Sequence, residues 1–120
     1  MAKGGSKAKQ VSSLYAEDEI WNHANSNNTT QPVGSKRPNA LEVYDLNGNV
    51  QEWCQDYYHG TFYYFSPNVN PVCSTPHPRY TYGVIRGGSW QQERVKVTDR
   101  RTAPPYVASA YLGFRCVLEE

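Results

Sequence analysis

The eight residues from Asp45 to Glu52, with sequence DLNGNVQE, combine two carboxylates, three amides and a glycine. Oxygen ligands at this density suit a hard cation such as Ca²⁺, which takes about six to eight oxygens and accepts backbone carbonyls. Gly48 permits the sharp turn that brings such groups together. The spacing differs from an EF-hand loop, whose glycine and bidentate Glu stand later. The alternative is a β-turn at Asn47-Gly48 that leads into a strand burying Glu52 and Trp53.

Four motifs place this loop in a wider pattern. They are a PVG and PNALEVYDLNGNVQEW block within residues 32–53, RGGSW at 86–90, an arginine pair at 100–101, and GFRCV at 113–117. In this order they resemble the formylglycine-generating enzyme family, also called sulfatase-modifying factors. The resemblance covers most of the chain and implies an α+β domain with a C-type-lectin-like fold.

Pattern and composition predict short strands, long loops and little helix. Prolines at 67, 71, 76 and 78 exclude a central strand from residues 59–80, and the polar residues 24–31 indicate another loop. Residues 1–13 are interpreted as a flexible arm, and 14–120 as a truncated sulfatase-modifying-factor-type domain that matches the C-terminal part of the family domain. The predicted strands are 50–58, 80–86, 93–101 and 112–118, and residues 16–21 form a short helix or strand.

Size and charge narrow the class of protein. The 120 residues suit one domain, and a formal net charge of +1 gives no reason to expect nucleic acid or an anionic membrane as partner. No apolar segment approaches the length of a membrane span. The basic N-terminus has no apolar stretch behind it, so the chain as written is expected in the cytoplasm, or outside it if the chain is a fragment of an exported protein. Self-association remains open.

Three cysteines leave at least one thiol unpaired. They are Cys54, Cys73 and Cys116. An oxidising compartment would permit a bridge between Cys54 and Cys73, and no CxxC or Cys/His cluster has zinc spacing.

The resemblance implies a calcium ion at residues 45–52, which we call the acidic loop. Family members bind calcium at this motif, so Asp45 and Glu52 are expected to donate side-chain oxygens, and Gly48 and Val50 backbone carbonyls. A second family site further upstream has only a loose match here, around Glu19 and Ile20.

The resemblance also raises an oxidase activity. The family's enzymes convert a client cysteine to formylglycine with O₂ and a copper ion held by two thiolates, which select Cu(I). Gln92 and Val97 stand near the places where those thiols are needed, and Gln51 replaces an aromatic residue of the oxygen pocket, although Ser89 remains. We therefore expect no copper and no catalytic residues. The alternative of a sulfatase-modifying oxidoreductase stays open.

Without the thiols, a binding or assembly module stabilised by calcium is the favoured function. The loop 102–111 carries two tyrosines, which offer amphipathic contact area at low entropic cost, and these could instead pack over the core. The variable proteins of diversity-generating retroelements are similar and hold ligands in this region, so a ligand-displaying protein of that kind is a further alternative. The predicted ligand-binding residues are Gln51, Ser89, Trp90, Gln92, Tyr106 and Tyr111.

The arginines allow two interpretations. They could bind an anionic ligand, or pair with carboxylates inside the fold, and pairing is favoured. The arginines are Arg86, Arg100, Arg101 and Arg115, and the candidate carboxylates are Asp56, Asp99, Glu42 and Glu52.

Overall fold

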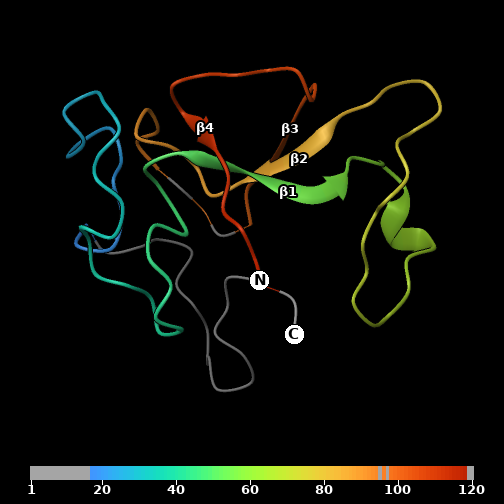
Figure 1. Ribbon diagram of the computed structural model, residues 1–120, viewed down its shortest axis with the longest axis horizontal. Coiled ribbons are helices and arrows are strands. Elements are labelled where there is room, and N and C mark those ends of the chain that lie inside the picture. The colour runs from blue at the N-terminus through green and yellow to red at the C-terminus, as the bar shows by residue number, and fades with distance from the viewer. Residues whose placement is uncertain (1–16, 95, 97, 119–120) are drawn as a thin grey trace.

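The computed structural model describes residues 17–94, 96 and 98–118, so the predicted arm at 1–13 lies outside the described residues. Loops connect four short strands and one 3-10 turn (Figure 1). The elements in chain order are β1 (Gln51–Tyr57), η2 (Phe62–Tyr64), β2 (Gly83–Arg86), β3 (Arg100–Ala103) and β4 (Leu112–Gly113).

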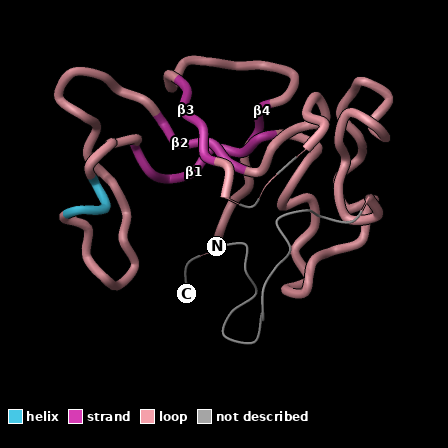
Figure 2. Tube along the Cα trace, turned by 180° about the vertical axis from the view of Figure 1, so that it is seen from behind, coloured by secondary structure: helices cyan, strands magenta, loops and turns pink. Residues whose placement is uncertain are grey.

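The strands form one sheet in the order β3-β2-β1-β4. β2 runs antiparallel to both β1 and β3, whereas β4 pairs with β1 in parallel. The β1–β2 register shifts between Trp53 and Tyr57. β2 begins at Gly83, which lies against the Trp53 ring. A side chain would not fit at this position, because a Cβ on Gly83 would lie 2.7 Å from a ring carbon. The loops before β1 lie on one side of the sheet and the loop between β1 and β2 on the other (Figures 1 and 2).

The predicted strands are confirmed in part. β1 and β2 fall inside the predicted ranges 50–58 and 80–86. The range 93–101 is wrong for most of its length, because the Asp99 amide donates to the Lys96 carbonyl in a turn and β3 starts only at Arg100; Val95 and Val97 lie outside the described residues. The range 112–118 is too long, since β4 ends at Gly113.

The prediction of little helix is confirmed. Within the described residues, η2 is the only helical element, and residues 17–19 form a turn where a short helix or strand was predicted. No helix in the described part of the chain has the length and apolar character needed to cross a membrane.

The core holds more polar than apolar side chains. Amides and hydroxyls replace strand pairing in the loops: the Asn49 side chain, for example, accepts from the Gln31 amide at 3.0 Å and donates to its carbonyl at 3.1 Å. Such bonds satisfy backbone groups that have no ladder partner. The buried apolar residues are Ile20, Cys73, Val84 and Ile85, and the buried polar ones are Asn22, Ser26, Asn47, Asn49, Gln51 and Ser89.

Candidate functional site

The acidic loop is held tightly between two other segments. Gly48 has φ +80°, and a Cβ there would lie 2.4 Å from the Trp21 carbonyl oxygen, so only glycine fits. The Gly48 amide donates to the Gly87 carbonyl at 2.7 Å, and the Asn49 amide donates to the Trp21 carbonyl at 2.8 Å. The loop therefore has a defined shape before any ligand arrives.

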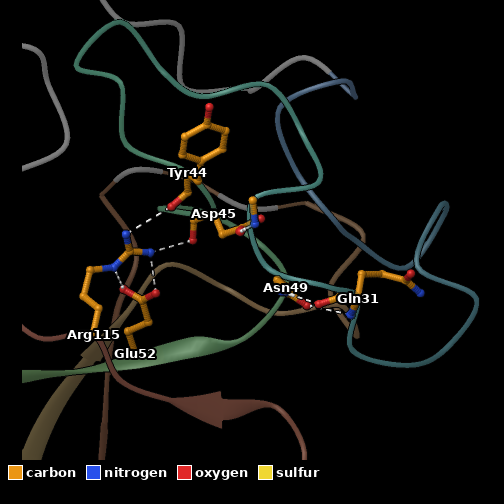
Figure 3. A network of polar contacts seen from close by, with 7 residues as sticks. Gln31, Tyr44, Asp45, Asn49, Glu52 and Arg115 are labelled. Atoms are coloured by element: carbon orange, nitrogen blue, oxygen red, sulfur yellow. Dashed lines mark hydrogen bonds and ion pairs between the residues drawn. The ribbon is translucent and has the colours of Figure 1, made fainter.

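Arg115 closes the loop from the other end of the chain (Figure 3). Its Nε and Nη2 donate to the two Glu52 oxygens at 2.7 and 2.5 Å, and its two Nη groups donate to the carbonyls of Tyr44 and Asp45 at 3.0 Å each. The hydrogen bond to Glu52 raises the pKa of Arg115, although burial acts in the opposite direction. The expected pairing of an arginine with a carboxylate is confirmed for Arg115 and Glu52.

One carboxylate oxygen in this loop fits a cation. Asp45 Oδ2 accepts from the Gly34 amide at 2.6 Å, while Asp45 Oδ1 is buried without a hydrogen-bond partner. Glu52 would have to share its oxygens with Arg115. Among the described residues, no group of three or more His, Cys, Asp or Glu side chains could hold a metal ion, so backbone carbonyls such as those of Gly48 and Val50 would have to complete the shell.

At the loosely matched upstream calcium site, the Glu19 carboxylate already pairs with an arginine. Glu19 Oε1 accepts from Arg37 Nη2 at 2.7 Å. Glu19 and Ile20 line a cavity of about 10 Å³ that they share with Asp45, which is room for one water molecule.

Five of the six predicted ligand-binding residues come together around the start of β1. The Gln51 amide donates to the Tyr111 carbonyl at 2.8 Å. The Gln92 Oε1 accepts from the Ser89 amide at 2.9 Å, and the Trp90 Nε1 donates to the Ala110 carbonyl at 3.2 Å. We call this group the polar cluster: Gln51, Ser89, Trp90, Gln92 and Tyr111.

The polar cluster has a buried base and a more open rim. Gln51 is 5% exposed and Ser89 2%, whereas Tyr111 is 37% exposed. No hydrogen bond joins the Gln51 side-chain amide to another described residue, and the nearby Ser109 Oγ is buried without a partner. Ser109 carries no signal in the sequence, because a single serine in a loop is unremarkable. Tyr106 is 85% exposed and takes no part in these hydrogen bonds.

Gln92 and the three cysteines bear on the copper site that the family's enzymes use. Gln92 presents a carboxamide, a hard donor that is already bound to Ser89, and Val97 lies outside the described residues. Cys54 is half-buried in β1, Cys73 is buried, and Cys116 is exposed; all three are free, so the bridge from Cys54 to Cys73 is not formed. Burial raises the pKa of Cys54, and Arg86 partly offsets this.

The pairing expected for the other arginines is not general. Arg100 Nη1 donates to the Tyr63 hydroxyl at 3.0 Å, and the guanidinium lies 5.4 and 5.2 Å from the ring centres of Tyr58 and Tyr63. Neither Arg100 nor Arg101 forms an ion pair with a described residue. One of the interactions of Arg86 is a hydrogen bond from its Nη1 to the Thr98 carbonyl at 3.5 Å.

Known proteins share this fold and sequence. The chain is 39% identical over 95 residues to a formylglycine-generating enzyme of Streptomyces coelicolor, covering 73% of this chain and 29% of the enzyme. It is 37% identical over 89 residues to the serine/threonine-protein kinase Pkn1 of Chlamydia trachomatis, covering 72% of this chain and 14% of the kinase. The chain therefore spans less than a third of the length of either relative.

A solved structure, Treponema denticola variable protein 1, superposes with a TM-score of 0.67 at 31% identity and covers 94% of this chain and 41% of its own. Residues 2–120 match the family described as the sulfatase-modifying factor enzyme 1-like domain. Because this match covers nearly the whole chain, the chain belongs to the sulfatase-modifying factor enzyme 1-like domain family.

Proposed function

We propose that this domain is a non-catalytic binding module with a C-type-lectin-like fold, which receives a small polar ligand at the polar cluster and is stabilised by calcium at the acidic loop. The observation that carries the proposal is the Gln51 side chain. The residue is 5% exposed, and its side-chain amide makes no hydrogen bond to another described residue. Among the described residues, the fully buried side-chain atoms without a partner are Asp45 Oδ1 and Ser109 Oγ, not those of Gln51, so the Gln51 amide keeps free donors and an acceptor for a small polar ligand.

The surroundings of Gln51 suit a ligand with both polar and flat apolar parts. Ser89 supplies a hydroxyl at the base, and the indole of Trp90 is fixed by its bond to the Ala110 carbonyl. Tyr111 adds a ring at the rim. A few fixed polar groups among aromatic side chains are typical of the residues that line small-molecule sites.

Gln92 argues for binding over oxidation. It stands near a position where the family's enzymes need a thiolate, and it instead orders the turn at Ser89. A carboxamide neither binds Cu(I) usefully nor exchanges disulfides. The formylglycine-generating activity of relatives is therefore not carried over to this chain.

For calcium, the support is the orphaned Asp45 Oδ1 and the fixed turn at Gly48. Asp45 would hold the ion with the carbonyls of Gly48 and Val50, and Glu52 would share its oxygens between the ion and Arg115. The ion would supply positive charge beside Asp45, whereas Arg115 already neutralises Glu52. The role of the ion here is to stabilise the loop that precedes Gln51, and no chemical step passes through it.

Thermal shift against a panel of amino acids and monosaccharides tests the ligand site. We expect at least one compound to raise the melting temperature of the wild type, to lose its effect on Gln51→Leu, and to keep it on Tyr64→Ser, which alters a side chain that is 90% exposed. A compound that acts equally on all three proteins does not use the polar cluster.

A second assay addresses catalysis directly. The domain is incubated with copper, oxygen and a cysteine-containing sulfatase peptide, and the mass of the peptide is measured by mass spectrometry. No mass change is expected. Conversion of the cysteine to formylglycine would show that the module is an enzyme, and the proposal would be wrong.

A further inference from the structure

β3 forms one edge of the sheet. It pairs with β2 on one side, and no described strand pairs with its other side. Arg100, Arg101 and Thr102 are all exposed. An edge strand presents a row of backbone N–H and C=O groups that an added strand can bind.

The charge at this edge is positive and uncompensated within the described chain. Arg100 and Arg101 form no ion pair with a described residue. Successive strand residues point to opposite faces, so one guanidinium flanks the edge on each face of the sheet. An anion at this edge would compensate the charge of Arg100 and Arg101.

Arg100 is already held in place. Its guanidinium contacts the rings of Tyr58 and Tyr63 and bonds the Tyr63 hydroxyl. Tyr58 in turn stacks on Tyr80, with ring centres 6.2 Å apart, and Tyr80 stacks on His77 at 4.1 Å. A fixed guanidinium loses little conformational entropy when it binds a carboxylate.

We propose that the β3 edge binds an extended acidic segment of a partner protein, which adds to the sheet beside β3 and places carboxylates against Arg100 and Arg101. Backbone hydrogen bonds supply part of the affinity and the two arginines select acidic side chains. Tyr63, which is 64% exposed, offers apolar contact next to Arg100. This surface is separate from the polar cluster, so the proposal stands independently of the ligand site.

The test is fluorescence anisotropy with a labelled ten-residue peptide in which Glu alternates with Thr. We expect saturable binding that weakens with added salt. Arg100→Gln should weaken it about tenfold, since a charge-assisted bond from a pre-positioned group is lost. Arg101→Gln should weaken it about threefold, as expected for a free surface charge. Arg94→Gln removes the same charge from an exposed residue before β3 and should leave the affinity unchanged.

Two altered peptides separate strand addition from simple attraction. A peptide with Lys in place of Glu should not bind. A peptide that keeps every Glu but carries N-methyl groups on alternate amides cannot join the sheet and should bind at least tenfold more weakly. Equal binding of the N-methylated peptide, equal loss in Arg94→Gln and Arg100→Gln, or no binding of the Glu–Thr peptide would each overturn the proposal. Circular dichroism of each variant confirms that it is folded.

Discussion

Replacing Arg115 tests whether the acidic loop depends on a residue from the far end of the chain. In Arg115→Met, four hydrogen bonds disappear: two to the Glu52 carboxylate and one each to the carbonyls of Tyr44 and Asp45. The apolar stem is roughly kept. Glu52 stays in a site where its side chain is only 16% exposed, now without a counter-charge.

The expected loss follows from these contacts. Hydrogen bonds to charged groups contribute about 1.5–3 kcal/mol each when buried, but the Arg115 side chain is 35% exposed and water replaces part of what is removed. We therefore expect the free energy of unfolding to fall by about 3 kcal/mol, or the melting temperature by roughly 10 °C for a domain of this size. Arg115→Lys keeps the charge but not the paired donors, and should lose about half as much.

Urea unfolding followed by tryptophan fluorescence, in the presence of a chelator so that no calcium shares Glu52, measures the loss. Arg94→Met is the matched control, because Arg94 is exposed, and it should cost less than about 0.5 kcal/mol. The double variant Arg115→Met with Glu52→Gln should show a coupling energy of about 1 kcal/mol or more. If Arg115→Met is no more costly than Arg94→Met, the pair does not hold the loop and the reasoning fails.

Three further predictions concern the loop and β1. Gly48→Ala should lower the free energy of unfolding in urea several times more than Gly34→Ala. Both glycines have positive φ, but a Cβ at Gly48 would lie 2.4 Å from the Trp21 carbonyl oxygen, whereas one at Gly34 would lie 4.0 Å from its nearest neighbour. Equal losses would mean that the close approach at Gly48 is absent. Calcium at about 100 times its dissociation constant should add about 2.7 kcal/mol to the wild type and much less to Asp45→Asn; a shift of the same size in both would exclude Asp45 as a ligand. Burial raises the pKa of Cys54 above its ordinary value of 9.0, so the unfolded thiol ionises first and the free energy of unfolding should fall more steeply above pH 9 in the wild type than in Cys54→Ala; parallel pH profiles would contradict this.

The family, the turn at Gly48 and the first strand could be predicted from short segments. Asn47-Gly48 fixes a turn through the left-handed conformation that glycine adopts, and Val50 to Tyr58 alternates as a strand does. Such signals lie within a few residues of one another, so no knowledge of distant contacts is needed. The predicted ligand residues lie in separate motifs of the sequence. Only the resemblance to the family, carried by the order of those motifs, indicated that they belong to one site.

The errors have one source. Residues 93–101 have the alternation of a strand, but the turn at Lys96 to Asp99 delays β3 until Arg100. The pattern after Leu112 also suggested a longer strand than the two residues that pair with β1. Pairing requires a neighbouring strand in register, and local pattern does not report where that neighbour ends.

By itself, the sequence determined where the chain turns, which residues could bind calcium, and that glutamine stands near a place where a copper enzyme needs cysteine. Only the tertiary structure decided that Arg115 occupies both oxygens of Glu52, that Gln51 and Ser89 are both buried, and that Arg100 lies against Tyr58 and Tyr63 at a sheet edge. Glu52 and Arg115 are 63 positions apart. Turns depend on the conformational freedom of a few adjacent residues, whereas ion pairs and sheet edges depend on which distant segments pack together.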